Sequence, residues 1–354
     1  MKAKRRGSHT SAKAPRLDLS REQILAFRRR VGALDARLPA GVRSLRLAAW
    51  AGLQDSMPRA AVLSIHARVA GTQPSTWEHD SLAQIWGPRY SVFVVAARDR
   101  ALFTLGRMPD DERGRTRAEN AAARLHELLS GSRMPYDSAG RALGVNPNSL
   151  RYGTTTGTIA LRWEGARRPV VWTVARPVIA PLDARHELAR RYLHIYGPST
   201  ALAFAKWAGL AGHSATSAFA ALGDTLLPVR TPVGDASALA SDEADLRQRP
   251  STGAPARLLP SGDAYYLLHG RDRSLLLPEA AQRNALWTSR VWPGAVLVDG
   301  EIVGVWRRTQ HEVTVEPFGR LSRTARTAVE AEAATLPLPD LARSIVVRWE
   351  AEVR

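Results

Sequence analysis

Two kinds of apolar pattern alternate along the chain: positions three or four residues apart, and short continuous runs. The first is typical of helices and the second of brief buried strands. A first helix is predicted from Ser20, where a capping box with Gln23 precedes apolar residues at helical spacing: Ile24, Phe27, Val31 and Leu34. Further helices are predicted over 44–53 and from Pro58 to about 70, and the run 92–105 predicts two short strands.

This order of elements recurs twice. A helix over 113–130 precedes a short helix at 137–143, a turn at Gly144, a helix from Asn146-Pro147, and strands at 159–163 and 170–174. Helices over 183–196, 199–209 and 215–222, with a turn at 212–214, then precede a strand at 226–229. Trp50-Ala51-Gly52-Leu53 and Trp207-Ala208-Gly209-Leu210 close the middle helix of their copies. The repeats predict three tandem winged helix–turn–helix units.

The predicted fold class is therefore α+β: mainly α with small β wings, plus a β-rich C-terminal region. Strands are expected there at 295–298, 302–307, 312–315 and 344–349, with an Asp299-Gly300 hairpin turn and a closing helix over 322–336. The predicted segments are a disordered basic tail, three winged helices of which the last ends in a mobile polar stretch (235–256), and the β-rich region: 1–17, 18–108, 109–180, 181–256 and 257–354.

Composition narrows the function. The 354 residues include no cysteine, which excludes disulfides, thiolate zinc sites and a cysteine nucleophile. Fifty Lys+Arg against 33 Asp+Glu give a net charge of +17, which favours a polyanionic partner, foremost nucleic acid. Six of these charges lie in the tail, and removing them leaves +11. No apolar run is long enough to span a membrane, and the basic start is not followed by the apolar core of a secretory signal. We expect a cytoplasmic, nucleoid-associated protein.

The second copy supplies candidate DNA contacts. Asn148, Ser149 and Arg151 lie on its second helix, the position that enters a DNA groove in helix–turn–helix proteins. Asn and Arg side chains read base edges, while Ser and Arg hold phosphates. The alternative is a protein–protein scaffold in which the same side chains are merely solvated.

A polar triplet, Gln54-Asp55-Ser56, precedes Pro58. Asp and Ser are common capping residues before a helix that starts with proline, so capping is the simplest interpretation. Gln54 is a poor cap and is explained least. The histidines lack metal-ligand spacing, and neither a Walker-type loop nor a Gly-x-Ser-x-Gly elbow occurs. We expect no metal and no small-molecule cofactor.

From about Leu17 to about Glu316 the chain resembles the AlkZ-like winged-helix DNA glycosylase family, which acts in interstrand crosslink repair. The carriers of the resemblance occur in order along the chain: Gly52–Ala61, Ser64–Arg68, Trp86–Tyr90, Ile159–Arg167, Arg191–Leu193, Tyr196–Thr200, Phe204–Leu210, Arg257–Pro260, Gly270–Arg273 and Pro293–Trp306. The resemblance implies three winged helices around a concave DNA-binding cleft. It also implies a monofunctional glycosylase that removes purines alkylated at N3 or N7 from double-stranded DNA, which we expect to act as a monomer.

The family's catalytic motif, Gln-x-Gln or Gln-x-Asp, falls on Gln54-Asp55-Ser56. The resemblance implies that Gln54 positions the hydrolytic water, with Asp55 or Ser56 in support. Ser56 departs from the family pattern, so a non-catalytic DNA-binding or transcriptional regulatory protein is the alternative. Arginines expected to contact DNA, in addition to Arg151, are Arg59, Arg89 and Arg273.

Overall fold

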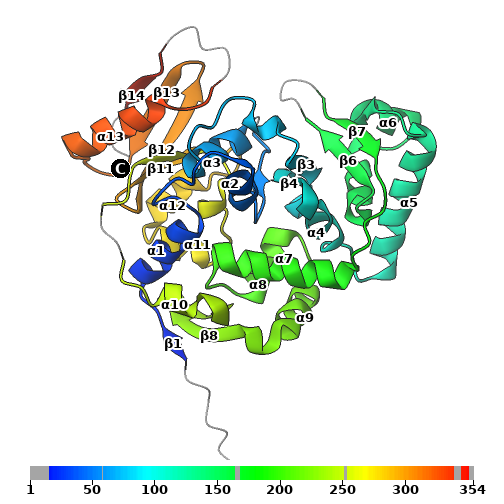
Figure 1. The fold of residues 1–354 in the computed structure, drawn as a ribbon, viewed down its shortest axis with the longest axis horizontal. Coiled ribbons are helices and arrows are strands. Elements are labelled where there is room, and N and C mark those ends of the chain that lie inside the picture. Colours follow the sequence, from blue (N-terminus) through cyan, green and yellow to red (C-terminus); the bar gives the residue numbers. More distant parts are fainter. Residues whose placement is uncertain (1–15, 58, 164–167, 251–252, 339–343, 351–354) are drawn as a thin grey trace, which may run out of the picture.

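A computed structural model describes residues 16–57, 59–163, 168–250, 253–338 and 344–350. Within these ranges, helices pack around three three-stranded sheets and one five-stranded sheet (Figure 1). This mixed arrangement confirms the α+β class. The predicted tail up to residue 15, Pro58, and residues 164–167 between the strands predicted at 159–163 and 170–174 lie outside the described ranges.

The first group of elements surrounds a sheet of order β2-β4-β3. The predicted capping box of Ser20 and Gln23 is confirmed, because each side chain bonds the other residue's backbone N–H. Strand β2 is only two residues long and pairs with β4, with Gln54 opposite Phe93. The elements are α1 (Arg21–Val31), α2 (Val42–Ala48), β2 (Leu53–Gln54), α3 (Ala60–Arg68), η1 (Thr76–Glu78), β3 (Leu82–Trp86), η2 (Pro88–Tyr90), β4 (Val92–Ala96), η3 (Ala97–Asp99) and α4 (Arg100–Leu105).

The two strands predicted over 92–105 are wrong in their second half, where α4 forms. Leu102, Phe103 and Leu105 of α4 are buried in the same core cluster as α7 (Pro181–Tyr196). An apolar run that is buried on all sides carries no periodicity, so its sequence does not distinguish a strand from a helix.

The second group surrounds a sheet of order β5-β7-β6, on the right of Figure 1. Its elements are α5 (Glu112–Leu129), β5 (Met134–Pro135), α6 (Tyr136–Ala142), η4 (Pro147–Thr156), β6 (Ile159–Arg162) and β7 (Val170–Thr173). The segment expected to be a recognition helix is the 3-10 helix η4. The hydroxyls of Thr154, Thr155 and Thr156 each donate to the carbonyl three residues earlier. These bonds fit the tighter winding of a 3-10 helix.

The third group surrounds a sheet of order β1-β8-β9. Its elements are β1 (Leu17–Asp18), α7, α8 (Ala201–Ala208), α9 (Gly212–Leu222), η5 (Gly223–Thr225), β8 (Leu226–Thr231), β9 (Gly234–Leu239), η6 (Ala240–Asp242) and α10 (Glu243–Leu246).

Three sequence expectations need correction in this group. Residues 212–214 begin α9 and do not form its preceding turn. Leu17, assigned to the disordered tail, pairs in parallel with Val229 of β8. The polar stretch 235–256 is not a loose linker in its first half, because β9 and α10 bury Ala238 and Leu246 in a core that they share with α1. These apolar residues are sparse in sequence and acquire a core only when β8 and α1 meet them.

The C-terminal region is a five-stranded sheet of order β10-β11-β12-β13-β14, covered by α13 (Figure 1). The predicted turn at Asp299-Gly300 is confirmed, with φ of 48° and 84°. Such positive φ values match the twist of a two-residue hairpin. The elements are β10 (Arg257–Leu259), η7 (Ala264–Tyr266), α11 (Asp272–Leu276), α12 (Ala280–Leu286), β11 (Gly294–Val298), β12 (Glu301–Thr309), β13 (Glu312–Pro317), α13 (Arg323–Ala334) and β14 (Val346–Trp349).

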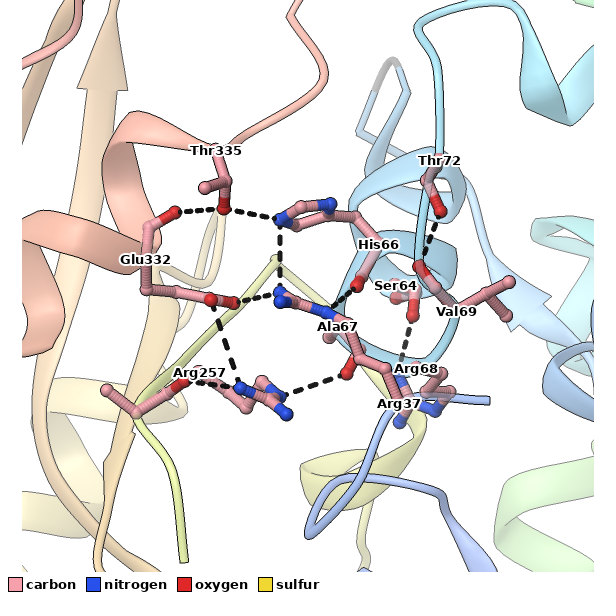
Figure 2. Close-up of polar contacts among 11 residues, drawn as sticks. Arg37, Ser64, His66, Ala67, Arg68, Val69, Thr72, Arg257, Glu332 and Thr335 are labelled. Carbon is pink, nitrogen blue, oxygen red and sulfur yellow. Dashed lines mark hydrogen bonds and ion pairs between the residues drawn. The ribbon is translucent and has the colours of Figure 1, made fainter. Parts of the chain in front are cut away.

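A buried polar cluster joins α13 to α3 (Figure 2). Arg37 donates to Glu332 Oε1 at 2.6 Å, to the His66 carbonyl at 2.6 Å and to His66 Nε2 at 3.1 Å. Arg257 Nη1 lies 3.9 Å from Glu332 Oε2, and its Nε donates to the Ala67 carbonyl. Burial, with the charges of Arg37 and Arg257, lowers the pKa of His66 to about 4. His66 is therefore neutral and accepts at Nε2.

Replacing Glu332 by alanine is expected to destabilise the fold by about 3 kcal/mol, because two arginines lose the carboxylate that compensates them in a buried site. Urea unfolding followed by circular dichroism measures the change. Glu330→Ala on the same helix is the matched control, since Glu330 bonds Trp349 at the exposed surface. Equal stability of the two variants would contradict a structural role for the cluster.

Candidate active site

The polar triplet lies where β2 ends, and its side chains alternate between the two faces of the strand. Gln54 pairs with Phe93 of β4, and the Asp55 N–H donates to the Val92 carbonyl at 2.8 Å. Alternation along an extended chain places Gln54 and Ser56 on one side and Asp55 on the other. Asp55 is 0% exposed, whereas Gln54 is half-buried and Ser56 is exposed.

Asp55 points into the protein and caps α3. Its Oδ1 accepts from the Ala61 N–H at 3.0 Å, and its Oδ2 accepts from Gln84 Nε2 at 2.9 Å. Arg59 Nη1 lies 3.6 Å from Oδ2. Burial raises the pKa of Asp55 to about 6, although the Ala61 N–H, Arg59 and Gln84 act in the opposite direction. The capping interpretation is therefore right for Asp55, whose side chain does not share a side with Gln54 and Ser56.

The Gln54 amide is held in one orientation. Its Nε2 donates to Ser56 Oγ at 3.1 Å, and its Oε1 accepts from Arg89 Nη2 at 3.2 Å. Gly262 packs against the amide so closely that a Cβ there would lie 3.1 Å from Gln54 Cδ. The backbone of Gly262 also has φ of +74°, so two separate constraints favour glycine at this position.

Arg89 is aimed at Gln54 by a strained turn. Arg89 and Tyr90 have φ of 54° and 57°, which non-glycine residues adopt at a cost of about 1–3 kcal/mol each. A Cβ on Gly209 would lie 3.2 Å from the Arg89 N and Cα atoms. Gly209, the glycine in the second copy of the Trp-Ala-Gly-Leu tetrapeptide, thus leaves room for this turn.

A neutral histidine contacts the Arg89 guanidinium at the nitrogen that does not bond Gln54. Arg89 Nη1 lies 2.6 Å from His269 Nε2. Burial, followed by the charges of Arg89, Arg273 and Lys206, lowers the pKa of His269 to about 3. The ring is therefore uncharged near neutral pH, so Nε2 accepts from Arg89 while Nδ1 carries the proton.

Cations concentrate around this histidine. Arg273 donates to the Leu268 carbonyl at 2.9 Å, and its guanidinium lies 4.9 Å and 5.3 Å from the ring centres of Trp287 and Trp292. The charge of Arg89 contributes to lowering the pKa of Arg273, after burial, so the two guanidiniums feel each other. Of the arginines expected to contact DNA, Arg89 therefore bonds Gln54, and Arg273 lies near enough to Arg89 to interact with it electrostatically.

Arg59 has a different setting. It stacks on Trp77 with its Cζ 3.6 Å from the ring centre, and it donates to the Trp163 carbonyl at 3.1 Å. Gln84 bonds both the N–H and the carbonyl of Trp163, at 2.7 Å and 3.2 Å. Arg59 and Gln84 thus join the first group of elements to the second.

The three residues of the second group that were expected to contact DNA lie in different surroundings. Asn148 is exposed at the start of η4, and the Ser149 hydroxyl donates to the Asn146 carbonyl at 2.7 Å. Arg151 instead lies over Trp86, 5.7 Å from its ring centre, and lines a cavity that Ser56 also lines. Only Arg151 is brought to the motif.

Gln84, Gly262 and His269 were not among the sequence candidates. Gln84 had a weak signal, as the polar residue inside the apolar run 82–86. Gly262 and His269 are more than 200 residues from Gln54 in sequence, so no local pattern points to them. The described residues contain no cluster of three or more His, Asp or Glu side chains suited to a metal ion.

This geometry can be compared with known proteins. The family model described as "DNA glycosylase AlkZ-like" matches residues 47–337. The chain belongs to the AlkZ-like DNA glycosylase family. An "Interstrand DNA cross-link repair glycosylase" of Streptomyces sahachiroi is 36% identical over 162 residues, which cover 44% of this chain and 42% of that protein. The match thus spans less than half of the relative's length.

The fold is also that of a solved family member. "Streptomyces sahachiroi DNA glycosylase AlkZ" superposes with a TM-score of 0.76 and 20% identity, covering 95% of this chain and 100% of that one. At this identity the likeness concerns the fold alone. No helix in the described part of the chain is long and apolar enough to cross a membrane.

Asp55→Ala is expected to lower the free energy of unfolding by about 2 kcal/mol. The substitution removes the α3 cap and leaves the Gln84 amide without its buried acceptor. Thermal unfolding by differential scanning calorimetry measures the loss. Asp80→Ala, at an exposed position before β3, is the control and should change stability little. An unchanged melting temperature for Asp55→Ala would contradict the capping role.

Proposed function

We propose that this protein is a monofunctional DNA glycosylase that hydrolyses the N-glycosidic bond of purines alkylated at N3 or N7 in duplex DNA. The observation that carries the proposal is the fixed Gln54 amide beside exposed Ser56, at the position of the family's catalytic motif, amid Arg89 and Arg273. The three groups of helices, each with a three-stranded sheet, support an arrangement of three tandem winged-helix units on DNA.

The reaction does not require the protein to protonate the leaving group. An N-alkylated purine is already a cation, so it leaves with the electron pair of the broken C1′–N bond and becomes neutral. Water then forms the new C–O bond at C1′ and gives its proton to solvent. Glycosidases commonly position that water with a carboxylate. An amide oxygen has two lone pairs, so Gln54 Oε1 can hold Arg89 with one and water with the other.

Ser56 and Asp55 have unequal parts in this scheme. Ser56 Oγ accepts from Gln54 Nε2 and so orients the amide, which makes it a positioning residue. Asp55 acts through the backbone, because its carboxylate is committed to α3 and Gln84. We propose Gln54 as the residue that touches the water, with Arg89, Arg151 and Arg273 as contacts to DNA.

A second function has its own support. Ser56 stands where the family has Gln or Asp, and the nearby carboxylate of Asp55 is buried. A site with one water-positioning group in place of two favours a non-catalytic DNA-binding protein. Both functions require DNA, so base release is what separates them.

Base release from a duplex carrying one 7-methylguanine should exceed spontaneous depurination at enzyme excess. Gln54→Ala should lower the single-turnover rate by about 100-fold, the order expected when one fixed polar group is lost from an active site. Gln73→Ala, an exposed glutamine in a loop, is the matched control. Ser56→Gln, which restores the family motif, should raise the rate. Release equal to the depurination control for wild type and Ser56→Gln would select the non-catalytic function.

Duplex binding should weaken steeply with salt, since each neutralised phosphate contributes a slope of about −0.9 in log K against log salt. Arg273→Met should reduce the magnitude of that slope by about 1 unit. Fluorescence anisotropy with a labelled undamaged duplex measures the slope. Arg247→Met, at the residue that follows α10, serves as the control for loss of a surface charge. A slope near zero for the wild type would point to a basic interaction scaffold.

A further inference from the structure

A cavity of about 520 Å³ opens beside Ser56, between the first and second groups of elements. Its lining includes Ser56, Trp86, Tyr90, Tyr136, Arg151 and Trp163. Gln54 does not line it. Of the three residues of the motif, Ser56 is therefore the one that borders the cavity.

The walls of the cavity are aromatic and mutually braced. Trp86 and Tyr136 meet edge to face with ring centres 5.9 Å apart, and Tyr90 meets Tyr152 in the same way at 5.1 Å. Trp163 is fixed through its backbone by Gln84 and Arg59. Flat rings held in place in this manner suit a planar ligand, because stacking requires no ordering of the walls when the ligand enters.

Arg151 supplies the cavity with a cation. Within the described part of the chain, its guanidinium has no carboxylate partner, and it lies over Trp86. The Arg151 Nε and the Trp86 Nε1 are both buried without a hydrogen-bond partner in those residues. Both atoms are enclosed by protein, whereas the Arg151 side chain as a whole is half-buried, so the accessible part of its guanidinium is what a ligand in the cavity would meet.

The strained turn links the cavity to the motif. Two successive residues have left-handed φ: Arg89 reaches Gln54, and Tyr90 lines the cavity. Backbone strain of this kind concentrates at functional sites, where the surrounding structure maintains it. One turn therefore sets the spacing between the amide and the aromatic wall.

We propose that this cavity is the receiving site for the leaving group: a free N-alkylated purine base, stacked against the half-buried rings of Tyr90, Tyr136 and Trp163 with its acceptor atoms toward Arg151. The proposal rests on the proposed glycosylase function, since it assigns the base to the Ser56 side and the attacked sugar to the Gln54 side. It also explains why the lining is aromatic and cationic rather than acidic.

The test uses binding of free 7-methylguanine to the full-length protein, measured by saturation-transfer NMR with 2-deoxyribose as a ligand that lacks a ring system to stack. Arg151→Met removes the charge and donors but keeps the length of the side chain. Ser91→Phe fills the cavity without changing charge, since Ser91 lines it. Arg115→Met, at an exposed position on α5, is the control, and circular dichroism verifies that all variants fold.

We expect wild type and Arg115→Met to bind 7-methylguanine equally well. An affinity about tenfold lower in both Arg151→Met and Ser91→Phe supports the cavity as the base site. No binding by wild type, or equal binding by all four proteins, overturns it. Excision assays on the same proteins separate this result from the enzyme itself. Excision without variant-sensitive base binding rejects the cavity and keeps the glycosylase. Base binding without excision rejects the glycosylase and, with it, the leaving-group role, and leaves a cavity that binds a free base.

Discussion

The buried carboxylate of Asp55 is the interaction on which the site depends. It accepts hydrogen bonds from the first turn of α3 and from Gln84 of β3, and so joins a helix and two strands at one point. Gln84 in turn holds the backbone of Trp163, at the end of β6 in the second group. Because successive side chains alternate along an extended chain, burying Asp55 leaves Gln54 and Ser56 together on the opposite side. The burial of Asp55 and the shared side of Gln54 and Ser56 are therefore consequences of a single arrangement.

Electrostatics around Gln54 follow from crowding of like charges. Arg89 and Arg273 surround His269, and burial together with their charges keeps that ring neutral. A neutral imidazole accepts from Arg89, whereas a protonated one would compete with it for the same position. Arg89 consequently remains directed at the Gln54 carbonyl, and the positive charge stays near the motif, where a DNA backbone would compensate it. The site combines a neutral, fixed amide with cations that suit phosphates.

Two segments whose structure differs from the sequence prediction share a physical cause. The sequence predicts a strand in the second half of 92–105 and a mobile polar stretch over 235–256. The first is a helix buried on several sides, so it shows no amphipathic period. The second has few apolar residues and gains order by adding β9 to β8 and α10 to α1. In both, contacts with distant segments outweighed local preference. The capping box at Ser20 and the Asp299-Gly300 turn are confirmed because each depends on residues only a few positions apart.

The sequence by itself determined the α+β class, most helices, the family and the position of the Gln54 motif, because these depend on local periodicity, turn chemistry and contiguous motifs. It also indicated a polyanionic partner, since net charge does not depend on folding. The tertiary structure decided which side of the strand Asp55 takes, and that Gly262 packs against Gln54 while His269 supports Arg89. It also decided that Arg151, rather than Asn148 or Ser149, lines the same cavity as Ser56. Those relations join segments far apart in the chain, and only packing brings these segments together.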